Sequence, residues 1–147
     1  MTIQKFILQN DLQQADVIVL KKKFFGMLDH FAVFLGYNYH TGVPLFAANY
    51  TKGTQFINQE ELASFLTQLI PERIERFNGN NMQRQQAIER AISRIGANDY
   101  NYFSNNCEHY KNFVQSGTPH SEQSKNFENG IAFGAVILLL GALLGDR

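Results

Sequence analysis

The chain is poor in cysteine, with Cys107 as its only thiol in 147 residues. A single thiol cannot form an intrachain disulfide and cannot build a zinc site from thiolates. The chain also lacks an excess of charge of either sign, because 13 basic residues balance 13 acidic residues. Binding of nucleic acid through a basic field is therefore not expected. We expect neither a metal nor a cofactor.

Long hydrophobic runs are scarce as well. The first ten residues hold no apolar core of signal-peptide length, so we expect an intracellular protein. One uncharged apolar run, residues 130–145, lies near the C-terminus. As a helix it would be about 24 Å long, against a bilayer core of about 30 Å, and apolar on every side. We predict a domain over residues 1–127 and an apolar helical tail over residues 128–147 that associates with a membrane; a buried terminal helix is the alternative.

The pattern along the rest of the chain gives strands first and helices later. Segments typical of strands lie at residues 17–20, 30–36, 44–50, 54–57 and 72–77. Residues 21–23, three lysines, favour a turn. Amphipathic helices are expected over residues 59–70, ended by Pro71, and after the loop at residues 78–81, ended by Gly96. This order predicts an α+β fold in which an antiparallel sheet packs against helices.

The residues around Cys107 are typical of a helix start. Asn105 and Asn106 favour an N-cap, and Gly117 favours a helix end, so the sequence predicts a helix over residues 107–116. Cys107 would then lie in the first turn, where unpaired N–H groups and the positive end of the helix dipole stabilise a thiolate. This indicates a nucleophile, although a small buried side chain is the commoner role of a free cysteine.

A cysteine nucleophile needs a base within hydrogen-bond reach, and the chain offers four histidines. His109 is two residues from Cys107 on the same helix and points away from it. His40 and His120 lie in turns and are expected to be exposed. His30 opens a strand of apolar residues, where an imidazole must find a partner. His30 is therefore either a satisfied core residue or the base that meets Cys107.

Two motifs carry a family resemblance. Residues 30–36 (His-Phe-Ala-Val-Phe-Leu-Gly) follow a His-aromatic-Ala/Gly-x-aromatic-x-Gly pattern, and residues 106–110 (Asn-Cys-Glu-His-Tyr) follow an Asn-Cys-Glu-His-aromatic pattern. Shorter similarities lie at residues 15–18 and 117–124. With these motifs, residues 15–127 resemble the lecithin:retinol acyltransferase-like family. The resemblance implies a circularly permuted papain-like fold.

The resemblance also implies a chemistry. Cys107 would take an acyl chain from a glycerophospholipid as a thioester and pass it to water, an amine or an alcohol, with His30 as general base and then general acid. The family usually carries a second histidine on the next strand, and residues 44–50 contain none. Asn49 is our candidate for the residue that orients the His30 ring, with His40 as the alternative.

Two other functions fit the same residues. One is a papain-like peptidase or amidase acting on cell-wall peptides, and the other is a non-catalytic interaction domain that retains the fold. The apolar tail favours the lipid enzyme, because a membrane-associated enzyme lies at the surface of its substrate. The presence of both Cys107 and His30 argues against the non-catalytic domain.

Overall fold

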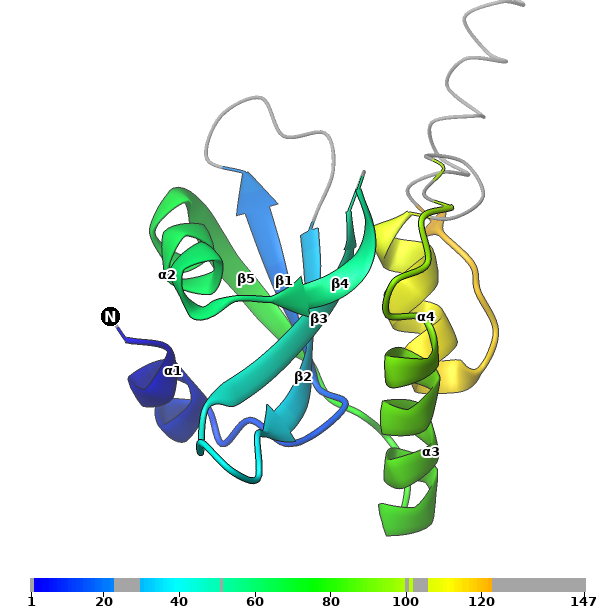
Figure 1. The fold of residues 1–147 in the computed structure, drawn as a ribbon, viewed down its shortest axis with the longest axis horizontal. Helices are drawn as coiled ribbons and strands as arrows, with labels where there is room; N and C mark the ends of the chain where they lie inside the picture. The colour runs from blue at the N-terminus through cyan, green and yellow to red at the C-terminus, as the bar shows by residue number, and fades with distance from the viewer. Residues whose placement is uncertain (1, 23–29, 51, 100, 102–105, 123–147) are drawn as a thin grey trace, which may run out of the picture.

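Figure 1 shows the computed structural model of the chain, which describes residues 2–22, 30–50, 52–99, 101 and 106–122. The elements, in chain order, are α1 (Ile3–Gln9), β1 (Val17–Lys22), β2 (His30–Tyr37), β3 (Pro44–Tyr50), β4 (Gly53–Ile57), α2 (Gln59–Gln68), β5 (Leu69–Glu75), α3 (Asn81–Ser93) and α4 (Cys107–Ser116). The predicted α+β class with an antiparallel sheet is confirmed.

The strands form one sheet in the order β4-β3-β2-β1-β5, and each neighbouring pair is antiparallel. This pairing brings the ends of β1 and β3 and the starts of β2, β4 and β5 to the same end of the sheet. That end, at the top of Figure 1, is called the upper end below. His30, Tyr50 and Gly53 belong to it, and the β2–β3 hairpin lies at the opposite, lower end.

Both faces of the sheet are covered. On one face, Val19, Phe31, Val33 and other strand residues pack with side chains of α3 and α4, among them Ala91 and Val114. On the other face, a second set packs with α1 and α2: Ile18, Leu20, Ala32, Phe34, Phe46, Ala48, Phe6, Ile7 and Leu62. Burial on both faces explains why β1 and β2 read as continuous apolar runs rather than alternating ones.

The predicted boundaries around β5 are wrong. The α2 helix ends at Gln68 rather than at residue 70, and β5 covers Leu69–Glu75 rather than residues 72–77. Pro71 lies inside this strand instead of ending the helix. A proline is tolerated there because β5 is an edge strand, and the register with β1 shifts at Leu20, the partner of Pro71.

Two further expectations are corrected. Lys21 and Lys22 continue β1 instead of forming a turn, because they pair with Ile70 and Leu69 at the start of β5. A helix, α1, precedes the first strand and was not predicted; Thr2 caps it, and Phe6 and Ile7 bury its inner side.

The apolar run at residues 130–145 lies outside the described residues. Among the residues that the structure describes, no helix combines the length and the apolar character needed to cross a bilayer.

Candidate functional site

Cys107 is the first residue of α4, as predicted. The Asn106 side-chain oxygen accepts the backbone N–H groups of Glu108 (2.9 Å) and His109 (3.1 Å), so Asn106 caps the helix. In return, Nδ1 of His109 accepts the backbone N–H of Asn106 (3.3 Å), which completes a reciprocal cap. At the other end Gly117, with a φ of 80°, ends the helix. The sequence therefore predicted α4 and both of its caps correctly.

His109 has a structural role at this helix start. Its ring is buried, and burial lowers its pKa below the usual 6.5, with His120 contributing in the same direction and Glu108 opposing. Nδ1 also lies 3.0 Å from the Asn106 side-chain oxygen, so both contacts of this ring nitrogen are with the capping residue.

Asn49 connects the sheet to this helix start. It is the sixth residue of β3, its side chain is fully buried, and its Nδ2 donates to the Asn106 carbonyl oxygen at 3.3 Å. The residue before Cys107 is thus bonded to the upper end of β3. The chain brings two predicted site residues, Asn49 and Cys107, into one neighbourhood.

The β3–β4 hairpin also holds the segment that leads from α3 toward Cys107. Thr54 is the partner of Asn49 in β4, its N–H donates to the Ala97 carbonyl, and its own carbonyl accepts the N–H of Gly96, both at 2.8 Å. The close approach requires glycine at position 53, where φ is +103° and a Cβ would collide with the Ala97 carbonyl oxygen.

His30 is the first residue of β2, half-buried and paired with Leu20 of β1. It belongs to the upper end of the sheet, as Asn49 does. Its neighbour Phe31 faces α4, because the Lys111 ammonium lies 5.0 Å from the Phe31 ring centre. Alternation along the strand assigns His30 to the opposite side, with Leu20.

The partner of His30 across β3 can be inferred from the register. Val33 pairs with Ala47 and Phe34 with Phe46, and the same register continued to the start of β2 brings His30 level with Tyr50. Burial raises the pKa of Tyr50, and Glu61 and Cys107 contribute in the same direction. Tyr50 lies at the end of the sheet where β2 begins and packs on the same face as Leu20.

His40 lies elsewhere. It is an exposed residue of the β2–β3 hairpin, where its N–H donates to the Asn38 side chain at 2.9 Å. The hairpin precedes β3, and Asn49 is five residues along that strand, which is about 16 Å at 3.3 Å per residue. The structure therefore brings Asn49, but not His40, to the start of α4. His120 is exposed, as expected.

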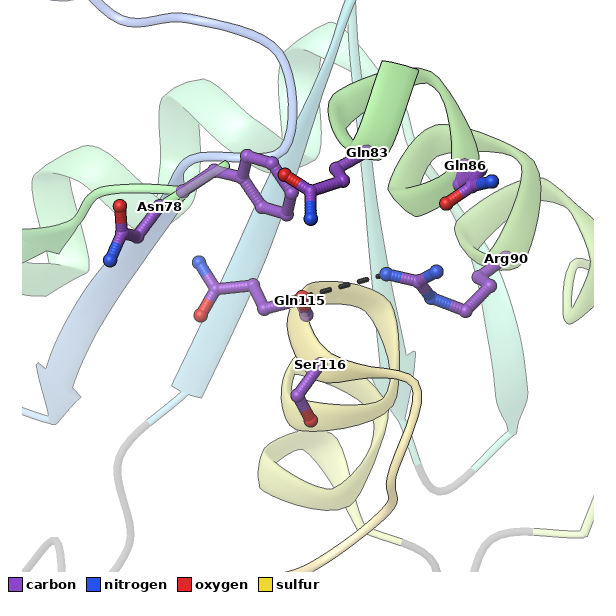
Figure 2. A pocket seen from close by; sticks show the side chains of 7 residues that line it. Asn78, Gln83, Gln86, Arg90, Gln115 and Ser116 are labelled. Atoms are coloured by element: carbon purple, nitrogen blue, oxygen red, sulfur yellow. Dashed lines mark hydrogen bonds between the residues drawn. The ribbon is translucent and has the colours of Figure 1, made fainter. Parts of the chain in front are cut away.

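A cavity of about 210 Å³ lies at the opposite end of α4 (Figure 2). Its lining is mostly polar: Phe77, Asn78, Gln83, Gln86, Arg90, Gln115 and Ser116. The guanidinium of Arg90 donates to carbonyl groups in the last turn of α4. None of the predicted site residues lines this cavity. In the described part of the chain, no cluster of His, Cys, Asp and Glu is suited to a metal ion.

Comparison with known proteins bears on the predicted family. The family model described as "Lecithin retinol acyltransferase" matches residues 10–120, which include every element from β1 to α4. A search of curated proteins found no match. Because the family model covers most of the chain, the protein belongs to the lecithin retinol acyltransferase family, and this membership points to an enzyme of the acyltransferase or phospholipase type.

Proposed function

We propose that this protein transfers an acyl chain from a glycerophospholipid through a thioester on Cys107. His30 takes the proton of the Cys107 thiol, the thiolate attacks the ester carbonyl, and the lysophospholipid leaves as its oxygen takes that proton from His30. An acceptor, which is water, an amine or an alcohol, then attacks the thioester and gives its proton to His30 as the thiolate leaves. Two easier steps replace one difficult transfer.

One observation carries this proposal: the hydrogen bond between Asn49 and the Asn106 carbonyl. It ties the residue before the nucleophile to the upper end of the sheet, the end at which His30 begins β2. The first turn of α4 favours the thiolate and offers backbone N–H groups to a developing oxyanion. Family membership supports the same reaction class.

Asn49 is our proposal for the residue that orients the His30 ring. Its buried position beside the start of α4 supports it over His40, which is exposed at the other end of the sheet. Regular alternation places the Asn49 and His30 side chains on opposite faces of the sheet, so this role requires the His30 ring to turn around the upper end of the sheet toward α4. Asn49→Ala should therefore slow acylation less than the loss of His30.

We also propose that the protein works at a membrane, to which residues 130–145 attach it. Ser121, next to the last described residue, bonds to Glu108 in the first turn of α4, so the described part of the chain ends near the helix end that holds Cys107. Removal of residues 128–147 should move the protein from the membrane fraction to the soluble fraction.

Mass spectrometry of the intact protein tests the chemistry. After incubation with phosphatidylcholine vesicles, the chain should gain the mass of one acyl group, and Cys107→Ala should gain none. His30→Ala should slow formation of the adduct by about a hundredfold or more. His120→Ala, which removes an exposed imidazole, is the matched control and should react at the normal rate.

Two outcomes would count against the proposal. An adduct that still forms on Cys107→Ala would show that Cys107 is not the nucleophile. Cleavage of cell-wall peptides without any reaction on phospholipid would favour the peptidase.

A further inference from the structure

The chain returns to the start of α4 after leaving the helix. Past Gly117 it runs back alongside α4 (orange in Figure 1), and the Asn112 side chain donates to the His120 carbonyl at 2.8 Å on the way. The segment brings Ser121 to the first turn of the helix, where only 2% of this residue is exposed. A polar side chain so deeply buried needs defined partners.

The Ser121 side chain bonds to both residues that flank Cys107 in the sequence. Its hydroxyl donates to Oε2 of Glu108 at 2.5 Å and accepts from Nδ2 of Asn106 at 3.3 Å. One hydroxyl can do both, because it has one proton and two lone pairs. Asn106 and Glu108 are themselves 5% and 8% exposed, so water does not replace the hydroxyl freely.

We propose that Ser121 is a positioning residue for Cys107, a role that deepens the function proposed above and rests on it. By bridging the residues before and after Cys107, the hydroxyl fixes the N-cap amide and the buried Glu108 carboxylate together. These two groups determine how the first turn of α4, with the nucleophile and its neighbouring N–H groups, sits against the sheet.

The effect of losing this bridge follows from the same contacts. Without the hydroxyl, the Glu108 carboxylate and the Asn106 amide each lose one hydrogen bond in a buried place, which favours a rearrangement of both groups. The Asn106 side-chain oxygen holds the N–H groups of Glu108 and His109, so any rotation of that amide alters the cap. A displacement of about 1 Å at a nucleophile is enough to reduce a rate by about a hundredfold.

The test compares Ser121→Ala with Ser116→Ala. Ser116 is the last residue of α4, at the end far from Cys107; its hydroxyl donates to the Asn112 carbonyl at 2.7 Å and accepts the N–H of Thr118 at 3.3 Å, at the start of the returning segment. We expect Ser121→Ala to lower the rate of acylation at saturating phospholipid by about tenfold or more while the apparent KM changes by less than about threefold. Ser116→Ala should leave both unchanged.

A second readout does not depend on lipid chemistry. Because the chain has one cysteine, iodoacetamide reports on Cys107 alone. Its rate of alkylation in the folded protein should change by about threefold or more in Ser121→Ala and stay unchanged in Ser116→Ala. If the protein does not acylate with phospholipid at all, this readout still tests the bridge, so the two proposals can fail separately.

Variants of Glu108 test the same contact by changing the acceptor of the Ser121 hydroxyl. Glu108→Gln removes the charge and keeps an acceptor oxygen, whereas Glu108→Ala removes both. The difference in acylation rate between the two variants therefore reports on the hydrogen bond from Ser121. We expect Glu108→Ala to match Ser121→Ala, and the double variant to be no worse than either single one. The Glu108 variants also serve if Ser121→Ala does not fold. A folded Ser121→Ala protein with the normal alkylation rate and acylation rate would overturn the proposal.

Discussion

The unpaired backbone groups at the two ends of α4 are hydrogen-bonded in different ways. Every helix leaves unpaired N–H groups at its start and unpaired carbonyls at its end. At the end of α4 the solution lies near the surface: Gly117 turns the chain, and Arg90 of α3 donates to the carbonyls of Phe113 (3.0 Å) and Val114 (2.6 Å). At the start, the solution is a buried set of polar side chains, Asn106, Glu108, His109 and Ser121.

The buried polar side chains at the start of α4 exceed what the stability of the helix requires. A single capping side chain satisfies a helix start, so stability alone does not require a buried carboxylate and a serine returned from beyond the helix. Burial of such groups costs free energy unless every one of them is bonded. A buried network can nevertheless hold one geometry, and Cys107 lies in the sequence between two members of this one, Asn106 and Glu108. The start of α4 therefore combines the capping of a helix with the positioning that we propose for a nucleophile.

The largest effect should come from Asn106→Ala at the start of the helix. This change removes the cap and the contact with Ser121, so we expect a loss of about 2 kcal/mol in the free energy of unfolding. Acylation of Cys107 should fall by about a hundredfold. Urea denaturation and intact mass measure the two quantities.

Asn106→Asp refines this experiment, because it keeps the capping oxygen and removes the Nδ2 that donates to Ser121. Because the new carboxylate would share the Ser121 hydroxyl with the buried Glu108 carboxylate, this variant should recover only part of the stability and still acylate more slowly than the normal protein. Normal acylation in a folded Asn106→Ala protein would show that the start of α4 is only a cap.

Arg90→Met at the other end should affect stability alone. Methionine keeps much of the apolar stem of Arg90 and removes the charged donors to the last turn, so we expect a loss of about 1–2 kcal/mol. The acylation rate should stay within about twofold of normal, since a distant change that preserves the helix start does not move Cys107. Arg73→Met, which removes an exposed ion pair with Glu75, is the control for loss of one positive charge. If Arg90→Met lowered the acylation rate as much as Asn106→Ala does, the start of α4 would have no special role in positioning Cys107.

The same comparison explains what the sequence could predict. The bounds and both caps of α4 follow from local signals, since Asn106 and Gly117 act on neighbouring backbone groups. Tertiary contacts decided the features that were missed. The residues at 69–71 joined β5 because β1 was available for pairing.

In the candidate site, too, residues could be proposed from the sequence, but their tertiary contacts could not. Asn49 could be proposed from its strand, but its bond to Asn106 spans 57 positions and depends on the packing of α4 on the sheet. The role of Ser121 was not visible in the sequence at all, because it requires the chain to return along the helix. A serine four residues after the helix-ending glycine does not by itself predict a contact with the start of the helix.

The smallest effect concerns pH, and it again separates the two ends. Burial favours the neutral ring of His109 in the folded protein, so its pKa there lies below the unfolded value of about 6.5. As the pH falls below that value, the unfolded chain binds the proton more readily than the folded chain, and stability is lost. Above it, the contribution of the reciprocal cap is fully present.

His109→Gln keeps a side chain that can accept the Asn106 N–H but does not titrate. Between pH 7.5 and pH 5.5, we expect the normal protein to lose up to about 1 kcal/mol more stability than this variant, as measured by urea denaturation at each pH. Arg90 stays charged throughout this range, so Arg90→Met should lower stability by the same amount at both values. An equal pH dependence in the normal protein and in His109→Gln would mean that the ring at the start of α4 is not the group that responds to the proton.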